Sequence, residues 1–272
     1  MQQNTLHIGD RLLEIDHPLV MGIINVTPDS FACHCTSITE AAVMTEAAKA
    51  LNEGADILDI GGCSTRPGYE PVSEEEEWRR VRIGLSAIRK HWPEAIVSVD
   101  TFRASVARKS VEQFGANIIN DISGGDLDAD MFATVASLRV PYIITHAREI
   151  GDHDVISEVV GVLQEKADTL HRLGVRDLIV DPGFGFGKTL EQNYELLRKL
   201  HYLQALELPI LVGVSRKSMI YRALGITPGE ALGGTIALNT LALENGAAIL
   251  RVHDVKEAKQ LTTIYSYYHG RS

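Results

Sequence analysis

The sequence is poor in cysteine and in positive charge, and each shortage argues against a class of protein. The chain has 272 residues but three cysteines, too few for a disulfide framework, so we expect a reducing compartment such as the cytoplasm. Its formal net charge of -10 argues against a nucleic-acid partner, because binding to a phosphate backbone depends on concentrated Lys and Arg. Cations in a functional site must therefore be placed locally.

Long apolar runs and common targeting signals are also missing. No apolar stretch is long enough to cross a bilayer, so we expect no membrane partner. Residues 1–10 lack both the basic and the apolar region of a secretory signal. No Gly-x-Gly-x-x-Gly turn follows the first predicted strand, which argues against a doubly wound, dinucleotide-binding sheet.

The sequence does contain a unit that recurs about eight times: a polar-patterned helical stretch, a glycine near its end, a short apolar run and a polar residue. Such a glycine can end a helix, and a short β-branched run suits a strand buried on both faces. Alternating helices and strands imply a parallel sheet. At this length we predict an α/β fold with one (β/α)8-barrel domain over residues 1–272.

The eight strands of the barrel are predicted at Leu19–Asn25, Ile57–Ile60, Ile96–Asp100, Ile118–Asn120, Tyr142–Thr145, Leu178–Asp181, Ile210–Val214 and Ile249–Val252. Helices fill the intervals. A β-hairpin is predicted to precede the barrel over Thr5–Ile15, turning at Gly9. Ser37 and Ser73, each followed by Glu three residues later, are the predicted N-caps of two helices.

The predicted strand ends are rich in polar residues. One such residue alone is more often a cap or a loop residue than a functional one. In a barrel, however, side chains at the carboxyl ends of all strands converge on one mouth, which favours a binding site. The polar residues are Asn25, Asp59, Thr65, Arg66, Asp100, Asn120, Asp181, Ser215, Arg216, Lys217, Arg251 and His253.

These residues fall into two chemical groups. Asp100, Asn120 and Asp181 offer acceptors for a flat heterocycle that carries amino and ring N–H donors, with Lys217 able to reach a ring carbonyl or nitrogen. A second group offers donors and a possible metal ligand for a phosphate or diphosphate. Its members are Asn25, Thr65, Arg66, Arg251 and His253. The predicted substrate has a donor-rich flat head and an anionic tail.

Over nearly its whole length the sequence resembles the dihydropteroate synthases, the pterin-binding barrels of folate biosynthesis. The stretches that carry the resemblance occur in the order of the family. They are Met21–Phe31, Ser64–Gly68, Ser98–Thr101, Ile119–Gly124, Asp181–Lys188, Gly213–Ser218 and Arg251–Asp254.

The resemblance implies a transferase that condenses 6-hydroxymethyl-7,8-dihydropterin diphosphate with p-aminobenzoate, giving 7,8-dihydropteroate and pyrophosphate. The implied catalytic residues are Asp100, Asp181, Lys217 and Arg251, and the implied pterin pocket adds Asn120, Ile122, Phe186 and Gly213. The implied diphosphate ligands are Asn25, Arg66, Arg251 and His253, with Mg2+ on Asn25. The implied p-aminobenzoate site is Phe31, Thr65, Arg66, Pro67 and Ser218. The family also implies a homodimer and a target of sulfonamides.

The sequence departs from the family pattern in three places. The stretch Ala32–Thr36 replaces the usual Ser, Asp and Gly residues, and its Cys-x-Cys lacks the second ligand pair of a structural zinc site. Cys63 replaces a common Glu. Thr145–Ile150 replaces Met-His-Met followed by Gly-x-Pro, and its His146 is interpreted as structural. These changes bear on p-aminobenzoate specificity and sulfonamide response more than on fold or pterin binding.

Two other functions are compatible with a pterin barrel. A methyltetrahydrofolate-dependent corrinoid methyltransferase shares the pterin pocket but needs no diphosphate site, so Thr65 and Arg66 together with Arg251 and His253 favour the synthase. A non-catalytic pterin-binding protein, in which altered loops have abolished condensation, stays open at the level of the sequence.

Overall fold

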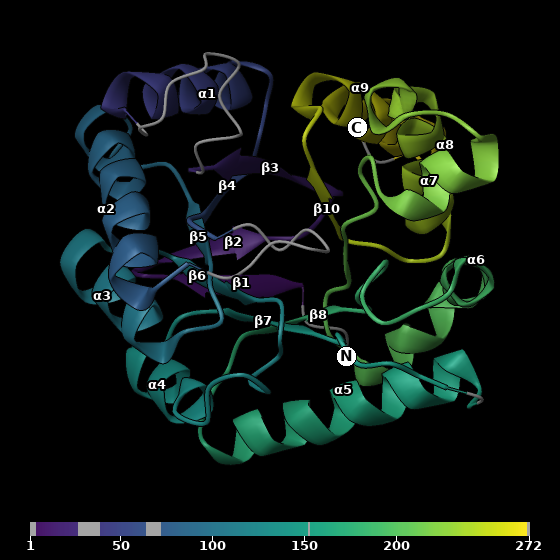
Figure 1. The fold of residues 1–272 in the computed structure, drawn as a ribbon, viewed down its shortest axis with the longest axis horizontal. Coiled ribbons are helices and arrows are strands. Elements are labelled where there is room, and N and C mark those ends of the chain that lie inside the picture. Colours follow the sequence, from purple (N-terminus) through teal and green to yellow (C-terminus); the bar gives the residue numbers. More distant parts are fainter. Residues whose placement is uncertain (1–3, 27–38, 64–71, 152, 271–272) are drawn as a thin grey trace.

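The computed structural model describes residues 4–26, 39–63, 72–151 and 153–270, in which eight parallel strands and the surrounding helices form a (β/α)8-barrel (Figure 1). The sheet order is β8-β7-β6-β5-β4-β3-β10-β9, and a parallel bridge between Val180 and Ile210 brings the two edge strands together. The barrel prediction is therefore confirmed, and the open doubly wound sheet is excluded.

The strands lie close to their predicted positions. They are β3 (Leu19–Asn25), β4 (Ile57–Gly61), β5 (Val97–Asp100), β6 (Ile118–Asp121), β7 (Tyr142–Thr145), β8 (Leu178–Asp181), β9 (Leu211–Val212) and β10 (Ile249–Val252). Only β9 is clearly shorter than predicted. Pro209 before it has no N–H to donate, and a turn closed by the Lys217 N–H and the Val214 carbonyl follows it.

Helices cover the outside of the barrel. They are α1 (Glu40–Asn52), α2 (Glu74–His91), α3 (Ala104–Phe114), α4 (Met131–Leu138), α5 (Val155–Arg172), α6 (Leu190–Arg198), α7 (Ser218–Leu224), α8 (Leu232–Glu244) and α9 (Val255–Tyr268). Ser73 caps α2 as predicted, since its hydroxyl accepts from the Glu76 N–H. The cap predicted for α1 is wrong: Thr39 caps that helix, and Ser37 lies outside the described residues.

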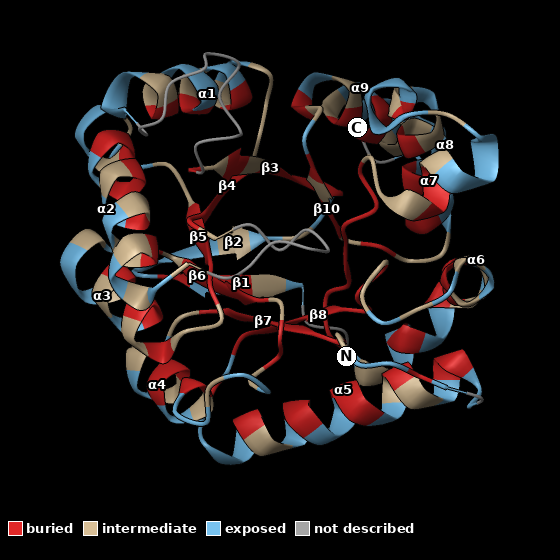
Figure 2. Ribbon diagram, viewed as in Figure 1, coloured by how far each residue is buried: buried red, intermediate tan, exposed pale blue. Residues whose placement is uncertain are grey.

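Buried apolar side chains form two cores. Figure 2 shows the buried residues along the strands and on the inward faces of the helices. The larger core lies between the strands and the helices, and the smaller one fills the inside of the barrel. Leu6 of β1 (Thr5–Ile8) and its neighbour Ile8 belong to the inner core, and β1 pairs with β2 (Arg11–Glu14) in the predicted hairpin. The hairpin therefore closes one end of the barrel and leaves the other end as its mouth.

Candidate active site

Polar side chains take the inward positions next to the mouth. The inner apolar core contains one isoleucine from each of five barrel strands, and a polar residue follows each of them two positions later. The pairs are Ile57 and Asp59 on β4, Ile118 and Asn120 on β6, Ile143 and Thr145 on β7, Ile179 and Asp181 on β8, and Ile249 and Arg251 on β10. Because side chains alternate between the faces of a strand, both members of a pair point into the barrel. The polar residues predicted at separate strand ends thus share one mouth.

Arg251 lies between two buried carboxylates. Its Nε donates to Asp59 Oδ2 at 2.7 Å, and a terminal guanidinium nitrogen donates to Asp100 Oδ2 at 2.6 Å. The side-chain amide of Asn120 donates to the same oxygen of Asp59 at 3.0 Å. We call these four residues the mouth network. Asp59 is fully buried, so the hydrogen bonds that it accepts are shielded from water. Such buried hydrogen bonds are stronger than hydrogen bonds at the surface.

Burial changes the proton affinities of the acidic residues at the mouth. Burial raises the pKa of Asp100 to about 7, against the opposing effect of Arg251, and the nearby Asp59 adds to the rise. Burial likewise raises the pKa of Asp181. For Arg251, burial lowers the pKa, but Asp59 and Asp100 outweigh it, so the pKa is raised and the guanidinium keeps its charge. Carboxylates deprived of water in this way gain most from a ligand that brings N–H donors.

The loop after β8 begins with a tight turn at Asp181. The carboxylate of Asp181 accepts from the Gly183 N–H at 2.8 Å. Gly183 has a φ of +72°, and a Cβ at this position would lie 1.9 Å from the carbonyl oxygen of His146. Only glycine fits here, so the loop lies directly on the backbone that follows β7.

The same loop holds Lys217, which comes from the segment after β9. The Lys217 ammonium donates to the Phe184 carbonyl at 2.5 Å and lies 4.5 Å from the centre of the Phe186 ring, a cation–π contact. Burial lowers the pKa of Lys217 to about 8, and the nearby charge of Asp181 limits this decrease. The Lys217 ammonium and the Asp181 carboxylate, which come from different parts of the chain, therefore interact electrostatically at the mouth. The sequence predicts both residues for one binding site.

The loops after β9 and β10 are joined by Arg216. This residue has a φ of +54°, a left-handed conformation that is uncommon outside glycine. Its guanidinium donates two hydrogen bonds to Asp254, at 2.9 and 2.7 Å. Beside it, the backbone N–H of His253 donates to the Ser215 hydroxyl at 3.2 Å. These contacts fix the backbone just before Lys217 and next to His253.

The remaining described residues of the predicted site also lie at strand ends. Asn25 ends β3, and an added Cβ at Gly61 would lie 3.7 Å both from Asn25 Oδ1 and from Asp100 Oδ2, so these two oxygens face one place. Gly213 lies against Arg251, because an added Cβ would be 3.8 Å from the Arg251 Cβ. Ile122 follows β6 and Ser218 begins α7.

Some predicted residues lie outside the described part of the chain. They are Phe31, Thr65, Arg66 and Pro67 of the predicted ligand sites, and the Cys33, His34 and Cys35 of the atypical stretch. Within residues 4–26, 39–63, 72–151 and 153–270, no group of three or more His, Cys, Asp or Glu is arranged to hold a metal ion. Metal binding at the mouth would therefore depend on oxygens such as that of Asn25 and on the substrate.

Two residues contribute to the site although the sequence assigns them no role. Asp59 is one of the polar strand-end residues, and it accepts hydrogen bonds from two members of the predicted pterin site. Lys188 only ends one of the stretches that carry the family resemblance, and its side-chain nitrogen contacts His146 and the backbone of the loop after β8. The inward alternation on β4 could have identified Asp59, whereas nothing local in the sequence indicates the contacts of Lys188.

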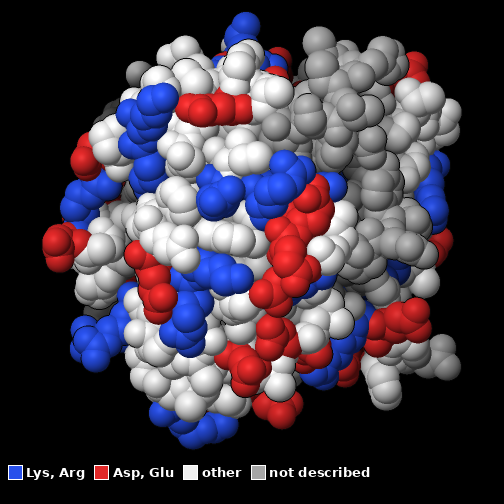
Figure 3. Space-filling view, turned by 60° about the vertical axis from the view of Figure 1, so that its left-hand side comes forward, with Lys and Arg blue, Asp and Glu red and all other residues white. Residues whose placement is uncertain are grey.

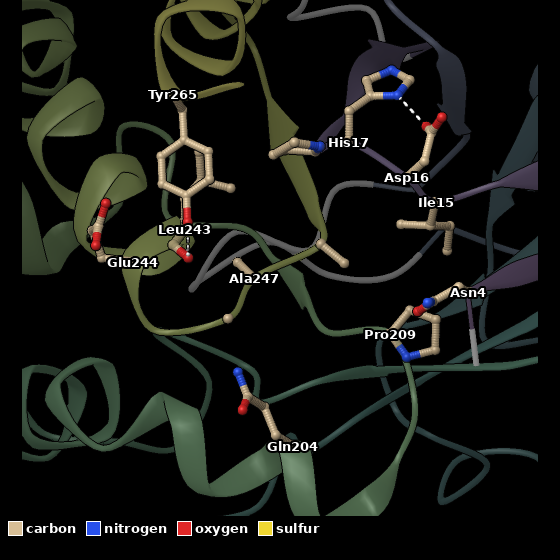
Figure 4. A pocket seen from close by; sticks show the side chains of 13 residues that line it. Asn4, Ile15, Asp16, His17, Gln204, Pro209, Leu243, Glu244, Ala247 and Tyr265 are labelled. Atoms are coloured by element: carbon tan, nitrogen blue, oxygen red, sulfur yellow. Dashed lines mark hydrogen bonds and ion pairs between the residues drawn. The ribbon is translucent and has the colours of Figure 1, made fainter. Parts of the chain in front are cut away.

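A pocket of about 410 Å³ opens at the opposite end of the barrel (Figure 4). Its lining comes from the hairpin ends, the segments before strands, and the helices α8 and α9, and includes Ile15, His17, Pro209, Gly246 and Tyr265. None of the residues that line it belongs to the predicted ligand sites. The pocket is therefore separate from the mouth network, on the far side of the inner apolar core.

The outer surface carries charge of both signs. Figure 3 shows one face, on which Lys and Arg side chains lie beside Asp and Glu side chains. On α2, Glu76 accepts from Arg79 at 2.6 Å and from Arg80 at 2.7 Å. Over the described part of the chain, no helix combines the length and the apolar character needed to span a membrane.

Comparisons with known proteins agree with this geometry. Residues 21–253 match the family of pterin binding enzymes. The chain is 40% identical to a dihydropteroate synthase of Clostridium beijerinckii, over 93% of this chain and 95% of that protein. It is 42% identical to the dihydropteroate synthase of Escherichia coli, over 90% of this chain and 89% of that protein.

A solved structure has the same fold. The dihydropteroate synthase of Xanthomonas albilineans with 4-aminobenzoic acid superposes with a TM-score of 0.91 at 39% identity, covering 99% of both chains.

Proposed function

The chain belongs to the dihydropteroate synthases, within the pterin-binding enzyme family, and we propose that it is a transferase with their activity. It condenses 6-hydroxymethyl-7,8-dihydropterin diphosphate with p-aminobenzoate and releases 7,8-dihydropteroate and pyrophosphate in folate biosynthesis. The observation that carries the proposal is the buried mouth network, with the charged pair of Asp181 and Lys217 at the same end of the barrel.

The pterin head binds among the buried acceptors. Asp100, Asn120 and Asp181 accept hydrogen bonds from its amino group and ring N–H groups, which satisfies carboxylates that lack water. Lys217 donates to a ring carbonyl or nitrogen. The planar guanidinium of Arg251 lies against the face of the ring, a contact that arginine makes well with flat π systems.

The pocket for the pterin is completed by smaller and apolar groups. Ile122 and Phe186 supply apolar surface to the edge of the ring, and both are only partly buried. Gly213 leaves space beside Arg251, where a larger side chain would meet the arginine Cβ. A flat ring can enter between these residues without moving the strands.

The diphosphate binds at the ends of β3 and β10, through Asn25, Arg66, Arg251 and His253. Mg2+ fits the Asn25 side chain there, because its Oδ1 is a hard oxygen at the end of a strand that borders the mouth. A protein site with few ligands also suits this ion, which commonly keeps water and substrate phosphate as its other ligands. When bound on Asn25, Mg2+ would supply positive charge to the diphosphate.

p-Aminobenzoate binds beside the pterin, between Ser218 at the start of α7 and the residues Phe31, Thr65, Arg66 and Pro67. The Xanthomonas albilineans structure with 4-aminobenzoic acid supports this assignment by its fold and its identity to this chain. Sulfonamides are anilines of similar shape and compete for the same place.

The reaction proceeds by an SN1-like route. The bond between the exocyclic methylene carbon and the diphosphate oxygen breaks first, and the electron-rich dihydropterin supports the positive charge on that carbon. Asp100 and Asp181 stabilise the cation, while Arg251 and His253 stabilise the departing pyrophosphate. The neutral amine of p-aminobenzoate then forms the C–N bond and releases a proton, so no strong general base is needed.

The direct test supplies purified chain with the pterin diphosphate, p-aminobenzoate and Mg2+, and measures pyrophosphate and dihydropteroate. We expect both products in equal amounts, and loss of both when EDTA removes the metal. Methyl transfer from methyltetrahydrofolate to a corrinoid, without pyrophosphate release, would replace the proposal with a methyltransferase. Pterin binding without either reaction would replace it with a non-catalytic pterin-binding protein.

The family resemblance also leads us to propose a homodimer formed through outer helices. Two helices that contact each other, α8 and α9, expose large apolar side chains: Leu241 is 50%, Ile264 71%, Tyr267 72% and Tyr268 79% exposed. Exposed apolar surface of this kind commonly marks an interface. Sedimentation should give a dimer for the wild type and a monomer for Ile264→Asp; equal masses would exclude this interface.

The scarcity of cysteine supports a reducing compartment, and we propose the cytoplasm. Fractionation of cells that produce the chain would test this, and recovery with the membrane or outside the cell would contradict it.

A further inference from the structure

Lys188 lies behind the loop that follows β8. Its Nζ is 3.0 Å from the carbonyl oxygens of His146 and Gly183, and 3.1 Å from that of Phe186. The same nitrogen is 3.0 Å from the His146 ring Nδ1. An ammonium group has three hydrogens to donate, and here four acceptors surround it. The side chain of Lys188 is thus committed to contacts within the protein rather than to a ligand.

His146 serves Lys188 as a neutral acceptor. It is fully buried, and burial, aided by the charge of Lys188, lowers its pKa to about 4. Burial lowers the pKa of Lys188 to about 7, and in its charged form the side chain can only donate. Nδ1 then accepts, which places the ring proton on Nε2. Nε2 has no hydrogen-bond partner among the described residues, so the ring's hydrogen bond there is the one with Lys188.

Two lysines hold opposite sides of the same short loop. Lys188 binds the Gly183 and Phe186 carbonyls, whereas Lys217 binds the Phe184 carbonyl between them and lies over the Phe186 ring. Gly183, Gly185 and Gly187 of this loop all have positive φ. Chain rich in glycine has little conformational preference of its own, so its shape depends on these contacts.

We propose that Lys188 is a positioning residue for the reaction: it fixes the 183–187 loop and thereby sets the place of the Lys217 ammonium at the pterin. The inference rests on the proposed function, because Lys217 donates to the pterin ring there. Without the Lys188 ammonium, the three carbonyls lose a common donor and the loop relaxes. A displacement of Lys217 on the order of 1 Å would then lower the rate by as much as about 100-fold.

A double-mutant cycle separates this role from general stabilisation. The four proteins are the wild type, Lys188→Met, Lys217→Met and the variant with both changes; methionine keeps an unbranched stem and removes the charge. The measurements are kcat/KM for the pterin diphosphate, KM for p-aminobenzoate, and the affinity for 6-hydroxymethylpterin by calorimetry.

We expect Lys188→Met to lower kcat/KM for the pterin diphosphate about 30-fold, and Lys217→Met about 100-fold, with KM for p-aminobenzoate within about 2-fold of the wild type. The double variant should match Lys217→Met within about 3-fold, because Lys188 acts through Lys217. Losses that multiply would overturn the proposal, as would wild-type kinetics in Lys188→Met.

Two further proteins keep the result clear. Lys199→Met removes a lysine that pairs with Asp154 and Glu195, neither of which belongs to the predicted ligand sites, and should leave all kinetic constants unchanged. If Lys188→Met does not fold, Lys188→Gln, which can still donate to two carbonyls, takes its place in the same cycle.

If the wild type binds 6-hydroxymethylpterin but forms no dihydropteroate, the proposed function is wrong. The role of Lys188 is then decided by the affinities of the four proteins for 6-hydroxymethylpterin. If the wild type does not bind it, both proposals fail.

Discussion

The inside of the barrel holds two layers of side chains with opposite chemistry. The layer next to the hairpin is apolar, and the layer at the mouth is charged, although the two stand two residues apart on the same strands. Apolar burial stabilises the first layer, whereas buried charges are tolerated in the second only because they are paired. One inward position on a strand thus supplies rigidity, and the next supplies function.

The largest effect should come from breaking the mouth layer at Arg251. Arg251→Ala leaves Asp59 and Asp100 without their shared cation and removes a group that contacts both halves of the substrate. We expect kcat/KM for the pterin diphosphate to fall about 1000-fold, or about 4 kcal/mol. Steady-state kinetics and a thermal melt of the same protein measure this. A folded variant with near-normal turnover would contradict the assignment.

A matched pair on β8 separates the two layers. Ile179→Ala opens a cavity in the apolar layer and should lower the free energy of unfolding by about 3 kcal/mol with little change in pterin affinity. Asp181→Asn keeps the shape of the side chain but removes its charge, and should weaken pterin binding about 30-fold with a nearly unchanged melting temperature.

Chemical denaturation measures the free energy of unfolding of both variants, and titration measures their pterin affinity. The separation into two layers would be wrong if Asp181→Asn bound pterin like the wild type, or if Ile179→Ala lost pterin affinity at temperatures where it is folded.

The sequence predicts the layers better than it predicts the contacts within them. The bounds of β3, β7, β8 and β10 follow from local signals: a short apolar run and a polar residue at its end, with a glycine before β8 and β10. Placing Asp100, Asn120 and Asp181 at one mouth needs only these bounds and the closed topology.

The bonds themselves depend on packing between distant parts of the chain. Asp59 meets Asn120 and Arg251, which follow it by 61 and 192 residues, and no local pattern pairs them. The left-handed Arg216 is held by Asp254 from another loop. Such contacts require knowledge of side-chain directions that the sequence alone does not provide.

A smaller effect should appear in the pH dependence of stability, because the mouth end contains a buried histidine and the apolar layer contains no titratable group. The folded state lowers the pKa of His146 from 6.5 to about 4, so between these values the unfolded chain binds more protons. This contribution to stability is present above about pH 6.5 and is lost as the pH falls towards 4.

His146→Gln should remove that contribution while keeping an acceptor for Lys188. Thermal melts of both proteins between about pH 7.5 and 4.5 would then show the wild type losing stability faster on acidification. Parallel curves would contradict this, because they would mean that the histidine has the same pKa in the folded and in the unfolded chain.

The smallest effect should follow from a change at the hairpin end. Asp177→Asn removes the charge of a carboxylate that lies 3.0 Å from the half-exposed His7. We expect a loss of stability below about 1 kcal/mol and unchanged pterin affinity, since such pairs contribute little. A clear loss of pterin affinity would show that the two ends are coupled across the apolar layer.

A crystal structure of the chain with 6-hydroxymethylpterin would show where the pterin binds. We expect the ring at the mouth, with its N–H groups on Asp100, Asn120 and Asp181 and its face against Arg251. A pterin bound in the pocket at the hairpin end, or away from those carboxylates, would contradict this assignment.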